Sequence, residues 1–275
     1  MNHLVINNRS LCCVGDIHGA FEGLIGWFRQ YDLQDATLVF CGDIGLGFES
    51  EAYYKQIFAK LNRECGKRNL TLIFVRGNHD DPTYFANQKI NYSNIKSVPD
   101  YTILSVAGHT VLCVGGGISI DRLYRQTKMM VLAVKYARFH GCSLEEAQVK
   151  SQRLYWEYEA PVYNEQALQE IAAKGVQIDV VCSHAAPSFC EPINKEGIEN
   201  WLAADANLEQ DLIKERATMD QIYECILAQR HPLKTWCYGH YHFHNVMEYN
   251  SIDFRLLDMS YRNANYDMYE FRRSE

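Results

Sequence analysis

Residues 11–18 read Leu-Cys-Cys-Val-Gly-Asp-Ile-His. The first five of these residues, Leu11 to Gly15, form a short apolar run, which predicts a buried strand. Asp16 and His18 follow the run, and residues two apart in an extended segment point the same way. The stretch therefore predicts a buried strand whose carboxyl end presents two polar side chains to one ligand.

Predicted helices and strands alternate as the chain continues. The apolar spacing predicts a helix over 21–31, a strand over 37–41, a helix over 51–67 and a strand over 70–75. A hairpin over 102–114, a long helical region over 144–173, a strand over 176–182 and a helix over 205–228 follow. The last predicted strands cover 235–238, 243–249 and 252–257. This alternation favours an α/β fold built on parallel strands with helical crossovers.

The composition is that of a soluble globular protein. The chain has 275 residues, of which 47% are hydrophobic and 22% charged, and no low-complexity tract divides it. We therefore expect a single domain over residues 1–275. Residues 103–120 carry no formal charge over the length of a marginal membrane span. The turn at Ala107-Gly108-His109 favours two strands there, and no membrane association.

Charge and cysteine content narrow the setting in which the protein works. The chain has 34 acidic and 27 basic residues, a formal net charge of -7. Gripping a nucleic-acid backbone is an electrostatic task, so the charge argues against nucleic acid as a main partner without excluding a local basic groove. Ten cysteines, many inside apolar runs, and an N-terminus without a signal-peptide pattern favour a reducing cytoplasm.

Five short polar motifs each follow a predicted buried strand. They are Asp16-Ile17-His18, Gly42-Asp43, Gly77-Asn78-His79-Asp80, Ser183-His184 and Gly239-His240-Tyr241-His242. Ligand sites of open α/β sheets gather beyond the carboxyl ends of the strands. We therefore expect the five motifs to meet at one edge of the sheet.

The residue types in these motifs suit two neighbouring divalent cations. Two metals ~3.5–4 Å apart clamp the attacking and leaving oxygens of a displacement, and a bridging carboxylate offsets their mutual repulsion. Mixed nitrogen and oxygen donors without thiolate suit manganese, iron or zinc. Two aspartates with two dications leave a net positive site, which attracts phosphate and lowers the pKa of bound water towards ~7.

The ordered set Asp-x-His, Gly-Asp, Gly-Asn-His-Asp, lone His and Gly-His-x-His resembles the calcineurin-like metallophosphoesterase superfamily. This superfamily includes small bacterial and phage-type metallophosphatases related to Ser/Thr protein phosphatases. The motifs run from Val14 to His242, nearly the whole chain. The resemblance implies a four-layer αββα sandwich, with a helical, lid-like insert around residues 118–175.

The resemblance also implies a role for each motif residue. One metal would be held by Asp16, His18, Asp43 and His242. The other would be held by Asp43, Asn78, His184 and His240, so that Asp43 bridges the two. His79 would face the leaving-group oxygen as general acid, or stabilise the charge of the transition state.

One motif departs from the protein Ser/Thr phosphatases. These carry Gly-Asp-x-x-Asp-Arg-Gly at the second motif, whereas residues 42–47 here read Gly-Asp-Ile-Gly-Leu-Gly. The second Asp, which orients the catalytic His in that subgroup, is replaced by Leu46, and the Arg is absent. This weakens the assignment as a protein phosphatase. Arg76 still matches that subgroup's third motif, which makes it a candidate phosphate contact.

A looser resemblance covers residues 115–160. The run Gly-Gly-Gly-x-Ser-x-Asp-Arg, followed by Tyr-Trp-x-x-Glu, is similar to an insert of some small bacterial and phage-type metallophosphatases. Such an insert would rim the substrate pocket, where Arg122 or Arg125 would touch a substrate phosphate. The plain alternative for the three glycines is a hairpin end or a hinge.

Some residues of the motifs have purely structural alternatives. Asp80 either polarises a neighbour or caps the helix or turn that follows. Cys41, Cys182 and Cys237 precede three of the motifs, and none forms a Cys-x-x-Cys pair, so core packing suits them better than metal ligation.

These observations predict an enzyme that hydrolyses a phosphoester by attack of a metal-bound hydroxide, first of all a phosphomonoesterase. A phosphodiesterase or nuclease, or a nucleotide polyphosphate hydrolase, is the alternative on the same fold. A non-catalytic scaffold is the alternative of a different class, against which the complete ligand set argues. The expected substrate is a phosphorylated small molecule, a nucleotide or a phosphoprotein, and the oligomeric state is not readable from the sequence.

Overall fold

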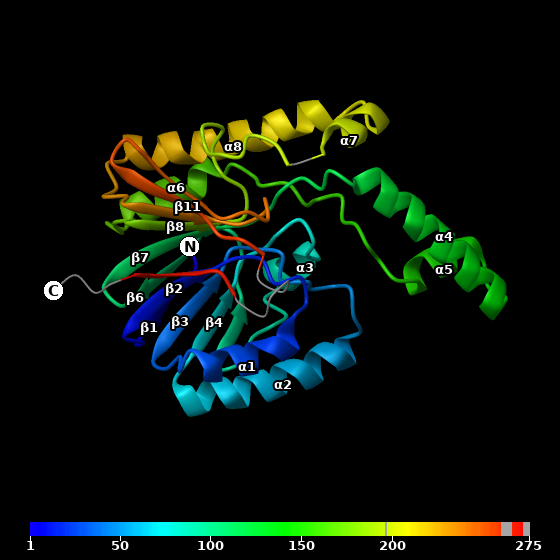
Figure 1. The fold of residues 1–275 in the computed structure, drawn as a ribbon, viewed down its shortest axis with the longest axis horizontal. Helices are drawn as coiled ribbons and strands as arrows, with labels where there is room; N and C mark the ends of the chain where they lie inside the picture. Colours follow the sequence, from blue (N-terminus) through cyan, green and yellow to red (C-terminus); the bar gives the residue numbers. More distant parts are fainter. Residues whose placement is uncertain (196, 260–265, 272–275) are drawn as a thin grey trace.

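The computed structural model describes residues 1–195, 197–259 and 266–271 of the chain. Within this part, two β-sheets face each other and helices cover their outer faces (Figure 1). The arrangement is the four-layer α/β sandwich that the sequence predicts.

The smaller sheet carries the first three motifs. Its described strands, in spatial order, are β12 (Met268–Phe271), β2 (Ser10–Val14), β3 (Ala36–Phe40), β4 (Thr71–Phe74) and β5 (Ile95–Ser97). β2 to β5 run parallel, and β12 pairs with β2 in the opposite direction. The carboxyl ends of β2, β3 and β4 therefore lie at the same edge of this sheet.

The larger sheet carries the other two motifs. Its described strands, in spatial order, are β1 (His3–Ile6), β6 (Thr102–Val106), β7 (His109–Val114), β8 (Val180–Ser183), β9 (Thr235–Tyr238), β11 (Ile252–Leu256) and β10 (Asn245–Tyr249). β6 and β7 form the expected hairpin within the uncharged stretch 103–120. Among the helices that the structure describes, none is both long and apolar enough to cross a membrane.

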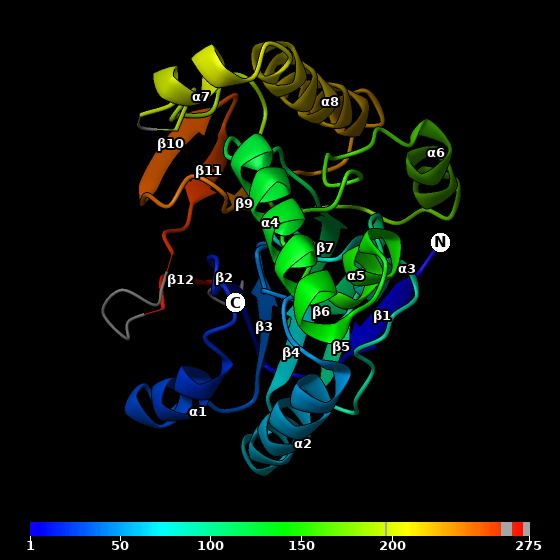
Figure 2. The ribbon, with the colours of Figure 1, turned by 90° about the vertical axis from the view of Figure 1, so that its right-hand side faces the viewer.

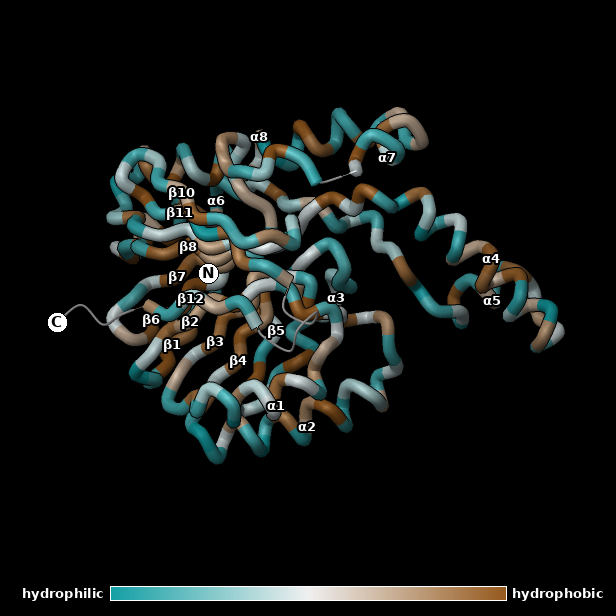
Figure 3. The backbone as a smooth tube through the Cα atoms, in the orientation of Figure 1, coloured by the Kyte–Doolittle hydropathy of each residue, from teal (hydrophilic) through white to brown (hydrophobic). Residues whose placement is uncertain are grey.

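Helices cover both outer faces of the sandwich. α1 (Phe21–Gln30) and α2 (Glu51–Arg68) lie on the smaller sheet, and α6 (Glu165–Ala173) and α8 (Leu208–Ala228) lie on the larger one (Figure 1). α1 buries Phe21, Leu24 and Phe28 against the smaller sheet, as its apolar spacing predicts. The short helices are α3 (Pro82–Ala86) and α7 (Glu199–Ala204). Figure 3 shows the hydrophobic residues gathered in the strands of both sheets.

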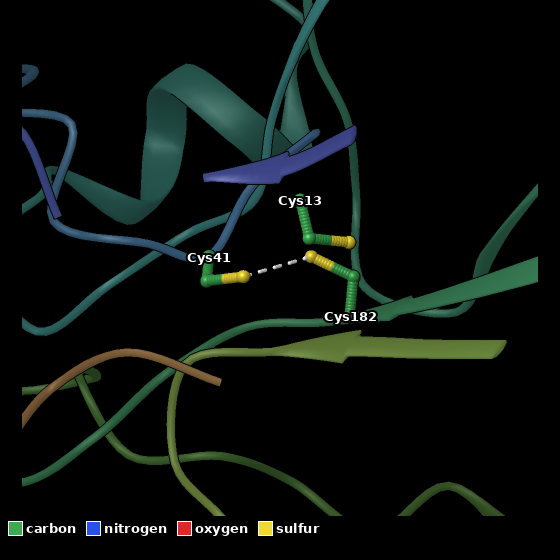
Figure 4. A group of neighbouring side chains, drawn as sticks. All are labelled: Cys13, Cys41 and Cys182. Atoms are coloured by element: carbon green, nitrogen blue, oxygen red, sulfur yellow. Dashed lines mark hydrogen bonds between the residues drawn. The ribbon is translucent and has the colours of Figure 1, made fainter. Parts of the chain in front are cut away.

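The core between the two sheets is rich in cysteine. Cys13 of β2, Cys41 after β3 and Cys182 of β8 lie together there, with the sulfur atoms of Cys41 and Cys182 3.3 Å apart (Figure 4). These three side chains are fully buried, and all ten cysteines are free thiols. They pack among valine, leucine and isoleucine side chains, which is how cysteine behaves as a small hydrophobe.

Two helices project from the body as an arm. α4 (Arg122–His140) and α5 (Leu144–Lys150) pack against each other (Figures 1 and 2). The helical region expected over 144–173 is confirmed at its two ends, as α5 and α6, and wrong in its middle, because residues 151–164 form neither helix nor strand. Pro161 disfavours helix at the residue before it. In addition, Arg76 takes main-chain carbonyls of residues 158–160 as acceptors, which a helix would use itself.

Candidate metal centre

The structure brings the five motifs together at one edge of the sandwich. β2, β3 and β4 end just before Asp16, Asp43 and Asn78. β8 and β9 end just before His184 and His240. Because β8 and β9 are neighbours in the larger sheet and β2, β3 and β4 in the smaller, both sheets contribute side chains to one centre.

The first group of donors is Asp16, His18, Asp43 and His242. Their donor atoms all lie within 4.8 Å of one another. His242 Nε2 is 3.0 Å from His18 Nε2 and 3.3 Å from Asp16 Oδ2, and His18 Nε2 is 3.6 Å from Asp43 Oδ2. Two imidazoles and two carboxylates that converge in this way form a donor set for a divalent metal.

The second group is Asp43, Asn78, His184 and His240. His184 Nε2 is 2.8 Å from Asn78 Oδ1, 3.3 Å from Asp43 Oδ1 and 3.1 Å from His240 Nδ1. His184 Nδ1 lies 2.7 Å from the carbonyl oxygen of Cys41, to which we assign its N–H as donor. This hydrogen bond fixes the tautomer that turns the Nε2 lone pair toward the centre, as in metal-binding histidines.

Asp43 belongs to both groups. Its Oδ1 accepts the backbone N–H of His79 at 2.8 Å. Its Oδ2 is buried and has no hydrogen-bond partner among the described residues. A buried carboxylate oxygen without a partner is costly, and a cation at the centre would remove that cost. Asp43 therefore fits the role of a metal ligand that is shared by two ions.

The charges at the centre favour cation binding. Burial opposes charge on Asp43, but above all the neighbouring His184 lowers the pKa of Asp43 well below its ordinary value. Burial likewise opposes charge on His184, but the carboxylates of Asp43 and Asp16 raise the pKa of His184 to about 9. The carboxylates thus attract a proton strongly to this histidine, and a bound metal would take the place of that proton.

Four of these donor residues have left-handed backbone conformations. The φ angles are 43° at His18, 48° at Asp43, 75° at His240 and 54° at His242. Each such conformation costs on the order of 1–3 kcal/mol for a residue other than glycine. Tight turns at the strand ends thus aim the side chains inward at a cost in backbone energy.

A cavity of about 730 Å³ opens next to the donor groups. His79 and Arg125 line it, and Arg125 Nη2 is 3.4 Å from His79 Nε2. Both oxygens of Asp121 accept from Arg125 Nε at 2.8 Å, which fixes the direction of the guanidinium. Burial lowers the pKa of His79 well below its ordinary value, and the tautomer of the ring decides whether Nε2 accepts from Arg125.

The other two candidate arginines lie elsewhere. Arg76 is buried, and its Nη2 donates to Asp100 at 3.0 Å. Arg122 donates to Asp205 at 2.5 Å and to Asp211 at 2.8 Å, which ties the start of α4 to residues near and in α8. Of the three candidates, the structure places only the guanidinium of Arg125 in the described wall of the cavity.

Asp80 caps the loops of the centre. Its carboxylate accepts the backbone N–H groups of Ile44, Gly45, Leu46 and Gly77. The helix α3 that follows is capped by Asp81, whose Oδ1 accepts the N–H of Thr83. The capping role of Asp80 therefore concerns the preceding loop rather than the following helix. His244 lies outside both donor groups, exposed and 2.7 Å from Asp267.

Three residues at the centre were missed by the sequence reasoning. Lys195, from the segment between β8 and α7, lines the cavity, and no motif surrounds it in the sequence. Ser119 accepts a hydrogen bond from Asn78, and Glu159 accepts one from Ser119. Both stand in the run noted over 115–160, as the Ser of Gly-Gly-Gly-x-Ser and the Glu of Tyr-Trp-x-x-Glu, and that run was the available signal.

A sandwich that presents this donor set at its strand ends defines a candidate metal-binding protein. The sequence matches the family model for the calcineurin-like phosphoesterases over residues 10–244, and the chain belongs to that family. It is therefore a metal-dependent hydrolase of phosphoesters. A search of curated proteins finds no match.

Several solved structures are similar to this chain. Phosphopantetheinyl hydrolase from Mycobacterium tuberculosis is 14% identical, with 97% of each chain covered and a TM-score of 0.42. A putative 5'-nucleotidase from Staphylococcus aureus is 12% identical, with 96% of this chain and 51% of that chain covered and a TM-score of 0.43. A protein serine/threonine phosphatase from Saccharomyces cerevisiae is 12% identical, with 99% and 84% covered and a TM-score of 0.35.

Proposed function

We propose that the chain hydrolyses a phosphomonoester at a centre of two divalent metal ions. Asp16, His18, Asp43 and His242 would hold one ion, and Asp43, Asn78, His184 and His240 the other. The observation that carries the proposal is the buried Asp43 carboxylate, which is shared by two donor groups and has one oxygen without a partner. When bound, the ions supply Lewis acidity and an activated water.

The donor types and the thiols support the finer points of the proposal. Nitrogen and oxygen donors without thiolate at the centre support manganese, iron or zinc as the ions. All ten cysteines are free thiols, which supports a reducing compartment, and we propose the cytoplasm.

The cations of the cavity support a monoester over a diester. A terminal phosphate carries a charge of about -1.5 to -2 near neutral pH, whereas a diester carries one negative charge. Arg125 and Lys195 line the cavity beside the donor groups and would pair with the additional charge. The substrate class remains a phosphorylated small molecule, a nucleotide or a phosphoprotein.

The segment around residues 118–175 would form the rim of this cavity within a single domain spanning residues 1–275. Ile120, Asp121 and Arg125, near the start of the segment, line the cavity. α4 and α5 then carry the chain away from the body (Figure 1). A substrate that enters the cavity would therefore pass the base of this arm.

His79 would support the departing oxygen, as proton donor or as hydrogen-bond donor to developing charge. We expect His79→Asn to lower kcat by at least about 100-fold on an alkyl phosphate, and less on p-nitrophenyl phosphate, whose leaving group needs little help. The bound metal, measured by elemental analysis, should stay unchanged. Equal losses on the two substrates would count against a role at the leaving oxygen.

The test of the proposal compares p-nitrophenyl phosphate with bis-p-nitrophenyl phosphate after manganese loading. We expect faster hydrolysis of the monoester, with Asp43→Asn as the inactive control. Preference for the diester would replace the proposal with a phosphodiesterase or nuclease. Hydrolysis of neither, with two ions confirmed bound, would favour a scaffold or a narrow substrate range.

A further inference from the structure

The Asn78 side chain is held on both sides of its amide. Its Oδ1 faces His184 Nε2 at 2.8 Å, and its Nδ2 donates to Ser119 Oγ at 2.8 Å. All three side chains are buried. An asparagine can bind a metal only through its oxygen, so whatever decides which way the amide faces also decides whether Asn78 is a ligand.

Glu159 determines the direction of the Ser119 hydroxyl. Ser119 Oγ donates to Glu159 Oε2 at 2.6 Å, and the backbone N–H of Ser119 donates to Glu159 Oε1 at 2.8 Å. With its hydrogen turned to Glu159, the hydroxyl offers a lone pair to Asn78. A flipped Asn78 would place its oxygen against that lone pair and its NH₂ group against the donors of the centre.

The Glu159 segment is fixed independently of its carboxylate. Arg76 Nη1 donates to the carbonyl oxygen of Glu159 at 2.7 Å, and the N–H of Gly117 donates to the same oxygen at 3.0 Å. At Gly116, a Cβ atom would lie 2.6 Å from the main-chain nitrogen of Pro161, so only glycine allows this approach. Main-chain contacts therefore hold the segment, and the buried carboxylate is not needed for that purpose.

A carboxyl group that is 1% exposed is expensive to bury, and burial raises the pKa of Glu159 to about 8. We propose that Glu159 and Ser119 are positioning residues, which hold the oxygen of Asn78 toward the ion bound by Asp43, Asn78, His184 and His240. The inference rests on the proposed function for the presence of that ion. It assigns the Ser of the Gly-Gly-Gly-x-Ser run and the Glu of the Tyr-Trp-x-x-Glu run to one task.

Glu159→Gln tests the inference with a side chain of equal size. The new amide would direct an N–H at Ser119 Oγ or turn the serine hydrogen toward Asn78, and either arrangement disfavours the required orientation. We expect manganese affinity at this second site to fall about 10–100-fold, while the site of Asp16, His18, Asp43 and His242 keeps its affinity. Elemental analysis at increasing concentrations of free manganese gives the number of bound ions. The electron paramagnetic resonance signal of a spin-coupled manganese pair shows whether both sites are filled.

Glu157→Gln is the matched control, because Glu157 is exposed and two residues away. It should bind two ions as the native chain does. Two ions of native affinity in folded Glu159→Gln protein would overturn the inference. If that variant does not fold, Ser119→Ala takes its place, because it removes the acceptor of Asn78 Nδ2. Selective loss of the second ion supports the inference, and native binding overturns it.

The same titration separates the inference from the proposed function. A native protein that binds two ions but hydrolyses no phosphoester would contradict the proposed function, and the variants would still decide the role of Glu159. A native protein that binds fewer than two ions would overturn both, because Asn78 would then have no ion to receive its oxygen.

Discussion

The backbone N–H of Leu46 donates to Asp80 Oδ1 at 2.8 Å. Leu46 stands where the resemblance to the protein Ser/Thr phosphatases would place a second aspartate, and here its side chain is fully buried in the core. Asp80 also accepts the N–H groups of Ile44, Gly45 and Gly77. One buried carboxylate thus joins the loop that carries Asp43 to the loop that carries Asn78.

We expect Asp80→Asn to destabilise the protein by roughly 2–3 kcal/mol, because an amide would turn donors toward backbone N–H groups that need acceptors. Urea unfolding of the apo-protein measures the change. Asp81→Asn is the control, because asparagine caps helices about as well as aspartate and a change within about 0.5 kcal/mol is expected. Similar losses in the two variants would show that the Asp80 carboxylate has no special role.

Arg125→Ala should raise KM for a phosphomonoester about tenfold or more, since a charge-assisted hydrogen bond is worth roughly 1.5–3 kcal/mol. The melting temperature should change little. Arg122→Ala should instead lower the melting temperature and leave KM nearly unchanged, because Arg122 pairs with Asp205 and Asp211 and does not line the cavity. Steady-state kinetics and thermal unfolding of both variants decide, and a larger rise in KM for Arg122→Ala would contradict the assignment.

His231 predicts a pH dependence of stability that is separate from the metal centre. Its Nδ1 accepts the N–H of Ile178, and its Nε2 lies 3.1 Å from Gln229 Oε1. Burial lowers the pKa of His231 below its ordinary value of 6.5. Below pH 6.5 the unfolded chain therefore binds a proton that the folded chain resists, so stability falls as the pH drops through this window.

His231→Asn removes this titration and keeps an acceptor for Ile178. The difference between the urea midpoints of the native chain and the variant should be smaller at pH 5.5 than at pH 7.5. The reason is that only the native chain loses the stability linked to neutral His231 on acidification. The histidines of the metal centre are common to both proteins and cancel in the comparison. An equal difference at both pH values would refute the prediction.

The left-handed conformation at His242 predicts a gain of stability on mutation. Asparagine tolerates this conformation better than histidine, so His242→Asn should stabilise the metal-free protein by about 1 kcal/mol. Manganese should reverse the order, because it stabilises only chains that bind it well. His244→Asn is the control, since His244 is exposed and its φ is not positive. A metal-free His242→Asn chain less stable than the native one would contradict the prediction.

The sequence predicted the central strands well because their signal is local. Leu11 to Gly15 and the other buried strands are short apolar runs that end in polar motifs, and each of these strands is present in the structure. Of the four strands at the sheet edges in the described part of the chain, β10 was predicted, whereas β1, β5 and β12 were not. β1 is half exposed and β5 has three residues, and β12 pairs with β2 from the far end of the chain, so local periodicity says little about them.

The site could be predicted as a list of residues, but the direction of its side chains could not. The strand-end rule placed Asp16 and His184 in one centre although 168 positions separate them in the printed sequence. Arg76 looked like a phosphate contact because it precedes a motif, yet Asp100 and main-chain carbonyls of the insert take its hydrogen bonds. Those partners come from segments without helical or strand periodicity, and no local pattern in the sequence predicts them.

The cysteine layer between the sheets limits how the protein recovers from damage. While the fold is closed, most of its thiols are sealed from oxidants by the surrounding aliphatic side chains. Once the chain unfolds, ten thiols meet oxygen and one another, and non-native disulfides can trap the chain before it folds again. In a reducing medium the thiols stay reduced, and the unfolded chain can fold again. The working lifetime of the molecule is thus set by the redox state of its surroundings as well as by its own barrier to unfolding.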